Sequence, residues 1–200
     1  MCIVAFFTGT RADYGLLHGS AKLLSECAGF NVGFIIGGNH FAKEFGESVH
    51  EIENDEHAIW AKIDITPLPV KSMEVVAFFG QTVSAVGQAL TKCNPDYLVV
   101  LGDRYETLAA AQAAFLLNIP VIHIHGGEQT AGAQDDFIRH SVTQLSSVHF
   151  VACERYKLRC IQLGASPECV FNFGAPGLDS LKQVDLLSRE EFFEEIGHVY

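Results

Sequence analysis

The sequence predicts a single α/β domain built on a doubly wound parallel sheet. Apolar runs rich in Val, Ile and Phe alternate along the chain with segments whose apolar residues recur at helical spacing. Several of these runs end at glycine, and charged or imidazole side chains follow at once. Strands joined by helices of this length pair in parallel through right-handed crossovers. The alternation, which shows no internal repeat, therefore favours a Rossmann-like sheet with helices on both faces.

Seven short apolar runs are predicted to form the strands. The run 97–101 is buried by composition, and Gly102 lets the backbone turn before the charged residues that follow. The run 121–125 has the same character and stops at Gly126. The expected strands are 2–8, 32–36, 59–65, 97–101, 121–125, 149–153 and 170–173.

Helices are predicted between these strands from the helical period of the apolar side chains. The segment 106–117 is apolar nearly all round, as a helix buried against a sheet is. Ser188, with Glu190 and Glu191 behind it, fits a capped helix start. A loop is expected at 66–70, which contains two prolines. The expected helices are one that ends near residue 27, then 41–53, 73–92, 106–117, 136–145, 156–163 and 178–184.

Composition limits the partners that the chain can have. Thirteen basic and 24 acidic residues give a formal net charge of −11, so nucleic acid and anionic membrane are not expected partners of the surface as a whole. A local basic site for a phosphate remains compatible with this charge. Apolar runs stay short of the ~20 residues that span a bilayer. The six scattered cysteines lack a zinc spacing, and the start of the chain lacks a signal peptide pattern, so we expect reduced thiols in a cytoplasmic protein.

Three loops are expected to meet at the carboxyl edge of the sheet. In the usual doubly wound order, the first and fourth strands are neighbours at a topological switch point, where ligands bind. Their loops carry Arg11 with Asp13, and Asp103 with Arg104. The loop after the fifth strand carries Glu128 and should lie beside them. This convergence predicts a ligand site.

Two residues near the first strands are candidate ligand contacts. The loop after the first strand lacks G-x-G-x-x-G, so a dinucleotide site is only weakly indicated. Arg11 lies where a helix amino terminus and a cation together could bind an anion. The alternative is a surface arginine paired with Asp13. His40 follows the second strand at the same edge and could contact a ligand.

Two histidines in the fifth strand raise the question of a metal. His123 and His125 alternate along the strand and should point to one face. Glu128, Asp135 and Asp136 offer further ligands, which would make a metal-dependent hydrolase. The opposing interpretation takes His123 as a core histidine with satisfied nitrogens, and we favour it.

The start of the helix at 136–145 gathers groups suited to proton transfer. Asp135 and Arg139 are four residues apart and can pair, while Asp136 and His140 share a different face. Helix capping with one ion pair would explain one aspartate, but not the whole set directly after a Gly-Gly loop. Carboxylates beside a histidine are common equipment for acid–base chemistry.

Five motifs together carry a resemblance to a known family. They are Thr-Gly-Thr-Arg-Ala-Asp-Tyr-Gly-Leu-Leu (8–17), Gly-Asp-Arg-Tyr-Glu (102–106), His-Ile-His-Gly-Gly-Glu (123–128), Ile-Arg-His (138–140) and Gly-Ala-Pro-Gly-Leu-Asp (174–179). The set resembles the hydrolysing UDP-N-acetylglucosamine 2-epimerases, which feed sialic and related nonulosonic acid synthesis. The resemblance covers residues 2 to about 181.

The resemblance implies a two-domain, glycosyltransferase-B-like enzyme with its active site between the domains and no cofactor. It implies conversion of UDP-N-acetylglucosamine to N-acetylmannosamine and UDP, through loss of UDP and addition of water with inversion at carbon 2. Residues 1–181 would be the amino-terminal domain, and 182–200 the start of a linker toward a carboxyl-terminal domain. The UDP-N,N'-diacetylbacillosamine 2-epimerases share these motifs and are the alternative. A non-catalytic module that dimerises or binds sugar is another.

The family's functional residues transfer to specific positions here. Asp103 and Asp135 match acidic groups used in proton transfer, and Arg11 and Arg104 match basic residues near the diphosphate and sugar. Many relatives have glutamate where this chain has His125, whereas Glu128 follows three residues later, so either could act. We assign proton transfer to Asp103, Glu128 and Asp135, with His125 orienting a carboxylate or sharing its proton. The predicted substrate contacts are Arg11, Arg104, His40, Arg139 and His140.

Two expectations concern the chain as a whole. We expect it to fold alone but to turn over UDP-N-acetylglucosamine negligibly, since a uridine pocket is not apparent in its sequence. We also expect a homodimer, because the apolar surface of the helix 106–117 and of the segment 75–79 exceeds what one sheet face would cover.

Overall fold

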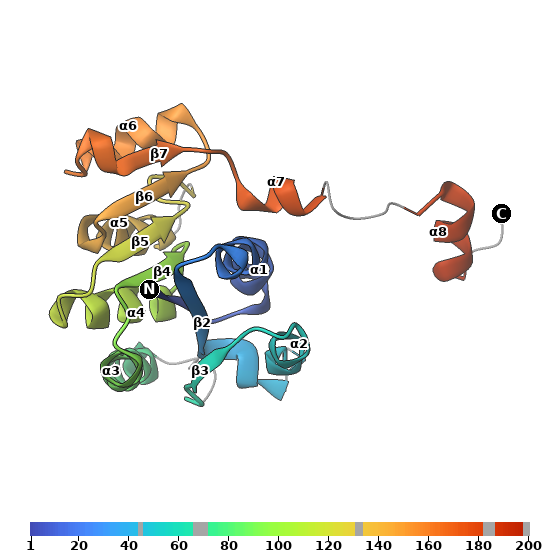
Figure 1. Ribbon diagram of the computed structural model, residues 1–200, viewed down its shortest axis with the longest axis horizontal. Coiled ribbons are helices and arrows are strands. Elements are labelled where there is room, and N and C mark those ends of the chain that lie inside the picture. Colours follow the sequence, from blue (N-terminus) through green and yellow to red (C-terminus); the bar gives the residue numbers. More distant parts are fainter. Residues whose placement is uncertain (44–45, 66–71, 131–133, 182–186, 198–200) are drawn as a thin grey trace.

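A seven-stranded, wholly parallel sheet forms the centre of the protein and confirms the predicted fold class. The computed structural model describes residues 1–43, 46–65, 72–130, 134–181 and 187–197. The strand order is β3-β2-β1-β4-β5-β6-β7 (Figure 1). The strands are β1 (Cys2–Thr8), β2 (Phe30–Ile36), β3 (Ile59–Lys62), β4 (Tyr97–Leu101), β5 (Val121–Ile124), β6 (Val148–Val151) and β7 (Val170–Asn172).

Most predicted helices are present, and one prediction is wrong. The single helix expected at 41–53 is instead a 3-10 turn and a short helix, because Gly46 and Glu47 both have left-handed backbones, with φ of 85° and 45°. The loop expected at 66–70 lies outside the described residues, as do residues 182–184 of the helix expected at 178–184. The helices are α1 (Arg11–Glu26), η1 (Gly38–Phe41), α2 (Val49–Asn54), α3 (Ser72–Cys93), α4 (Tyr105–Leu116), α5 (Asp135–Leu145), α6 (Glu154–Gln162), η3 (Pro167–Cys169), α7 (Pro176–Leu181) and α8 (Arg189–Glu195).

Crossover handedness decides which helices cover which face of the sheet. The chain runs from β1 to β3 in one direction, which places α1 and α2 on one face. From β3 it reverses toward β7, which places α3, α4 and α5 on the opposite face (Figure 1). Each face has its own apolar core, one built around Phe34 and Leu17 and the other around Phe7 and Leu98.

The reversal brings the loops after β1, β4 and β5 together, as predicted. Strand β1 pairs with β4, and β4 pairs with β5. The first loops interlock further, because Asn39 N donates to Gly9 O at 2.7 Å. Gly102, which has a φ of 82°, turns the chain directly after β4. Charged side chains from separate segments therefore share one edge of the sheet.

The apolar surface of the helix predicted at 106–117 was the first argument for a homodimer, and only part of that surface is covered. Its alanines are covered by the protein itself, since α4 packs between α3 and α5. Met73 and Val76 of α3 do remain exposed. Phe115, Leu116 and Leu117 at the end of α4 are exposed as well, and the homodimer stays a prediction. The covered alanines of α4 are Ala109, Ala110, Ala111, Ala113 and Ala114.

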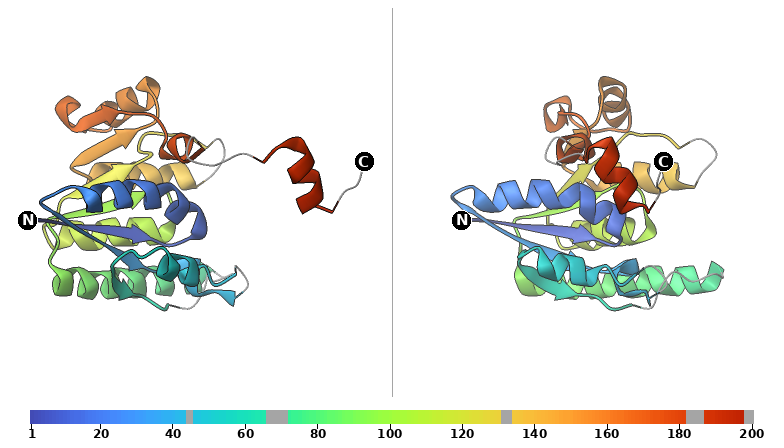
Figure 2. Two further views of the ribbon diagram at one scale, coloured as in Figure 1. Left: turned by 45° about the vertical axis from the view of Figure 1, so that its right-hand side comes forward. Right: turned by 90° about the vertical axis from the view of Figure 1, so that its right-hand side faces the viewer.

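The carboxyl-terminal helix α8 stands away from the sheet, beyond α7, as Figure 1 and the left view of Figure 2 show. Its predicted cap is confirmed: Ser188 accepts from Glu191 N, and the Glu191 side chain accepts from Ser188 N. The domain boundary predicted at residue 181 stays a prediction. Among the described helices, not one is both long and apolar enough to cross a membrane.

Candidate active site at the carboxyl edge of the sheet

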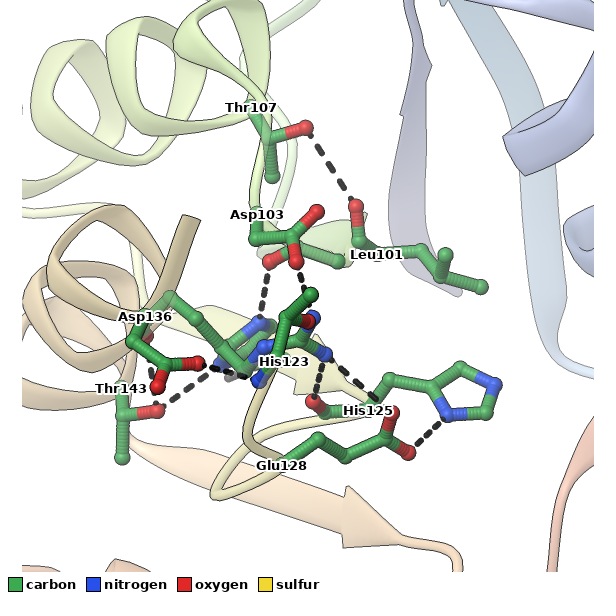
Figure 3. A network of polar contacts seen from close by, with 11 residues as sticks. Leu101, Asp103, Thr107, His123, His125, Glu128, Asp136 and Thr143 are labelled. Atoms are coloured by element: carbon green, nitrogen blue, oxygen red, sulfur yellow. Dashed lines mark hydrogen bonds and ion pairs between the residues drawn. The ribbon is translucent and has the colours of Figure 1, made fainter. Parts of the chain in front are cut away.

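Arg139 of α5 joins the loops that follow β4 and β5. Its Nη2 forms an ion pair with Asp103 Oδ2, while Nη1 donates to Glu128 Oε2 at 3.3 Å and to the His125 carbonyl at 3.1 Å. Figure 3 shows Asp103 and Glu128 approaching this point from different elements. The Arg139 side chain is only 7% exposed, so its N–H groups need acceptors within the protein.

The predicted pair of Asp135 with Arg139 is therefore wrong. Asp135 lies on the exposed side of the first turn of α5, whereas Arg139 lies on the buried side and has three acceptors there. Asp135 still lies close enough for its charge to raise the pKa of Asp103. Asp136, next to it, accepts from Thr130 N at 2.7 Å and holds the preceding loop.

His125 and Glu128 form a short hydrogen bond across the tip of the β5 loop. The distance from His125 Nδ1 to Glu128 Oε1 is 2.5 Å. His125 was predicted as the last residue of its strand, but β5 ends at Ile124 and His125 has a left-handed backbone with φ of 64°. This conformation turns its side chain away from the alternation of the strand.

The two glycines before Glu128 serve close packing rather than flexibility. A Cβ atom on Gly127 would lie 2.4 Å from the carbonyl oxygen of Tyr156 in α6. Gly127 also has a φ of 74°, which side chains with a Cβ rarely adopt. The loop can therefore pass against α6 and return Glu128 to His125.

His123 is a core histidine, as we favoured. It is fully buried, its Nε2–H donates to the Gly102 carbonyl at 2.9 Å, and its Nδ1 lies 3.3 Å from Thr143 Oγ1. Burial lowers its pKa to about 3, so the ring stays neutral. It fixes the turn that presents Asp103, while His125 points elsewhere. The described residues contain no group of three His, Cys, Asp or Glu side chains placed to hold a metal ion.

The environment moves the pKa values of the two carboxylates in opposite directions. Burial raises the pKa of Asp103, and the charges of Asp135 and Glu128 add to that, against the opposing charge of Arg139. Burial also acts to raise the pKa of Glu128, but the hydrogen bond from His125 and the charges of His125 and Arg139 outweigh it, so that pKa is lowered. Two neighbouring carboxyl groups whose pKa values are moved apart in this way suit acid–base catalysis.

The two predicted anion-binding arginines lie in different settings. Arg104 is 37% exposed and pairs with Glu106. The positive charge of Arg104 opposes the rise in the pKa of both Asp13 and Asp103, so Arg104 lies near the carboxyl groups of the β1 and β4 loops. Arg11 is 72% exposed and pairs with Glu51 at 2.8 Å, away from the cluster.

Asp13, the partner expected for Arg11, is instead buried inside its own loop. Its Oδ2 accepts from Gly9 N at 2.8 Å and from Thr10 N at 3.2 Å. Thr10 in turn caps α1 by accepting from Asp13 N. Burial raises the pKa of Asp13 to about 6. The alternative that paired Arg11 with Asp13 is therefore wrong.

His40, predicted as a ligand contact, is closed off in this structure. Its side chain is fully buried, with Nε2 2.9 Å from Thr8 Oγ1 and Nδ1 2.8 Å from Ser48 Oγ. Burial lowers its pKa to about 4. Both nitrogens are engaged, so we leave His40 out of the proposed contacts. His140 differs, because its Nε2 is buried without a hydrogen-bond partner among the described residues.

Glu106 was missed by the sequence analysis. It was treated as the first residue of an apolar helix, yet it is a fully buried carboxylate paired with Arg104. A charged residue inside an otherwise apolar helix, two positions after an arginine, was the signal that could have identified it.

The fold and this cluster define a class of protein: an α/β domain that holds acid–base groups at the switch point of a parallel sheet. Residues 22–198 match the family described as UDP-N-acetylglucosamine 2-epimerase. The chain belongs to this family.

Individual relatives agree with that assignment. The chain is 37% identical over 194 residues to UDP-N,N'-diacetylbacillosamine 2-epimerase (hydrolyzing) of Legionella pneumophila, covering 97% of this chain and 51% of that one. It is 33% identical over 195 residues to the UDP-N-acetylglucosamine 2-epimerase of Neisseria meningitidis serogroup B, covering 96% and 50%. The crystal structure of UDP-GlcNAc 2-epimerase from Neisseria meningitidis bound to UDP-GlcNAc shares the fold, with a TM-score of 0.80, 22% identity, and coverage of 98% and 53%. The chain spans about half the length of the curated relatives it matches.

Proposed function

We propose that the chain supplies the acid–base groups of a hydrolysing UDP-sugar 2-epimerase. The observation that carries the proposal is the pair Asp103 and Glu128, bridged by Arg139 and driven to opposite pKa shifts. Epimerisation with inversion at carbon 2 needs one group that removes a proton and another that returns one to the opposite face of the sugar. The family and the names of the relatives support the same activity.

The roles follow from the protonation states that the site favours. Glu128, ionised and held by His125, accepts the carbon 2 proton while the bond from carbon 1 to UDP breaks. Asp103, whose pKa is raised, returns a proton to carbon 2, and the water that adds to carbon 1 gives its surplus proton back to Asp103. Glu128 then loses the proton that it accepted to solvent. Asp135 assists from the start of α5. Arg104 offsets the charge of the departing diphosphate. Arg11, at the amino terminus of α1, joins it by exchanging its exposed ion pair with Glu51 for the diphosphate.

Two substrates are candidates. UDP-N-acetylglucosamine follows from the family description. UDP-N,N'-diacetylbacillosamine is favoured by a specific observation, namely the 37% identity with the Legionella pneumophila relative of that name. A cytoplasmic homodimer completes the proposal.

The test is an assay for released UDP with both sugars. We expect a chain extended to the relatives' full length to release UDP from one of them and to exchange the carbon 2 hydrogen with solvent deuterium. We expect the 200-residue chain alone to fold but to turn over far below the ~10 per second of ordinary enzymes. Absence of UDP release from either sugar by the extended chain would contradict the proposal.

A further inference from the structure

Glu106, the second residue of α4, is a buried carboxylate to which the proposed reaction gives no role. Its side chain is 0% exposed. An ionised carboxylate in such a place is costly unless it is paired. Its partner is Arg104, whose Nε and Nη2 both donate to Oε1, at 3.2 and 3.1 Å.

The other contacts of Glu106 argue against a simple role in stability. Its Oε2 is buried and has no hydrogen-bond partner among the described residues. Replacing a half-satisfied buried ion pair by apolar groups often leaves stability unchanged or higher. Folding alone therefore gives little reason for a carboxylate here.

The surrounding loops leave room for this carboxylate. A Cβ atom on Gly9 would lie 3.3 Å from Glu106 Cβ, and one on Gly38 would lie 3.0 Å from Glu106 Oε1. Gly38 also has a φ of 58°. The loops after β1, β2 and β4 thus close around one carboxylate, and that carboxylate holds one arginine at the carboxyl edge.

Two donors on one oxygen fix the plane of the Arg104 guanidinium. Nε and Nη2 are the groups used, and Nη1 has no hydrogen-bond acceptor within the described part of the chain. The Arg104 side chain is partly exposed, so the N–H groups of Nη1 are open to a ligand. A guanidinium held in one plane is well suited to phosphate oxygens.

We propose that Glu106 is a positioning residue that orients Arg104 to bind the diphosphate of a nucleotide sugar. The identity of the ligand rests on the proposed function. The carboxylate also cancels part of the positive field of Arg104. If Glu106 acts by orienting Arg104, its replacement should weaken binding of the diphosphate. If it acted only by reducing the positive field of Arg104, its replacement should strengthen that binding.

The experiment measures UDP binding and the Arg104 Nε–H signal in a chain extended to the relatives' full length, by titration calorimetry and ¹⁵N nuclear magnetic resonance. In the wild type we expect a protected Arg104 Nε–H signal that shifts when UDP is added. Glu106→Leu removes the acceptor and should lose the protection and weaken UDP binding about tenfold. Glu106→Gln, which keeps an acceptor, should weaken binding less. The exposed Glu26→Gln is the matched control and should change nothing.

A double-mutant cycle separates action through Arg104 from a general effect on the fold. On an Arg104→Met background, Glu106→Leu should cause no further loss of UDP binding. Arg104→Lys keeps the charge but not the planar fork, and should weaken binding as Glu106→Leu does.

Four results would overturn the inference. They are tighter binding by Glu106→Leu, equal losses on both backgrounds, wild-type binding by Arg104→Lys, or an Arg104 signal that UDP leaves unmoved. The last would remove Arg104 from the diphosphate site, whereas UDP release by the extended chain judges the proposed function separately.

Discussion

Two polar regions at the same edge of the sheet use the same residue types in different ways. The first is the bridge around Arg139, with Asp103, His125 and Glu128. The second lies under the loops after β1 and β2 and contains Asp13 and His40. In the first region, the partners come from three separate elements, and the side chains of Asp103 and Glu128 are 22% and 24% exposed. In the second, the carboxylate and the imidazole are buried.

The difference lies in which elements supply the partners of each group. His40 has both nitrogens engaged, whereas His125 Nε2 is buried without a hydrogen-bond partner among the described residues. Asp13 accepts from the backbone of its own loop and keeps one buried oxygen, Oδ1, without a partner there, whereas Asp103 faces a charge from another helix. A place at the carboxyl edge therefore does not by itself give a side chain a role in chemistry. An ion pair between charged groups of separate elements is the better guide.

The largest expected effect tests this division directly. In a chain extended to the relatives' length, Asp103→Asn and Glu128→Gln should each slow the chemical step by about 10²-fold or more while substrate still binds. Asp13→Asn should leave that step within about threefold, since Asp13 lies inside its loop. Single-turnover release of UDP is the measurement. A loss for Asp13→Asn as large as that for Asp103→Asn would remove the distinction between the regions.

The same assay decides between the two groups joined at the tip of the β5 loop. His125→Asn should be milder than Glu128→Gln, because we give the imidazole an orienting role. Near-normal rates for Glu128→Gln with an inactive His125→Asn would mean that the imidazole has the role that glutamate has in many relatives.

A smaller effect is expected from the bridge between the carboxylates. Arg139→Met should lower the rate about tenfold, since its positive charge opposes the rise in the pKa of Asp103 and lowers that of Glu128. Without that charge both pKa values rise, so Glu128 stays protonated to higher pH. The variant should lose more activity at pH 6 than at pH 8, which a pH–rate profile measures. An unchanged profile would show that Arg139 does not tune the pair.

A few-fold effect on the rate is expected from Arg159, which contacts the loop that carries Glu128 but not Glu128 itself. Arg159 of α6 donates Nη1 to the Gly127 carbonyl and Nη2 to Gln129 Oε1 at 2.8 Å, so it holds the loop that carries Glu128. Arg159→Gln should reduce kcat about threefold with little change in KM. Its exposed neighbour Arg155 offers a matched control, and Arg155→Gln should match the wild type. Equal losses in both variants would point to surface charge rather than to loop position.

Periodicity and topology rules predicted the sheet, its order at the switch point and the meeting of three loops. They could not predict partners that depend on three-dimensional burial. The pair of Asp135 with Arg139 followed from helical spacing, but spacing cannot say which side of α5 is buried. Likewise, the position of His40 in a carboxyl-edge loop gave no sign that Thr8 and Ser48 enclose it. Strand alternation failed at His125, where the strand had already ended.

The smallest expected effect lies in the acid stability of the second region, where Asp13 and His40 should oppose each other. Burial lowers the pKa of His40 from 6.5 to about 4, so the unfolded chain takes up the proton first, and this contribution to stability is lost as pH falls through that range. Burial raises the pKa of Asp13 from 3.8 to about 6, so its folded form takes up the proton first, and that contribution is lost as pH rises through 6. Between pH 7 and 5.5, each group should change the free energy of unfolding by about 1 kcal/mol, with opposite signs. Urea unfolding at the two pH values should therefore show His40→Gln less sensitive to acid than the wild type, and Asp13→Asn more sensitive. If both variants changed the acid sensitivity of the free energy of unfolding in the same direction, the pKa shift that we assign to one of these two groups would be wrong.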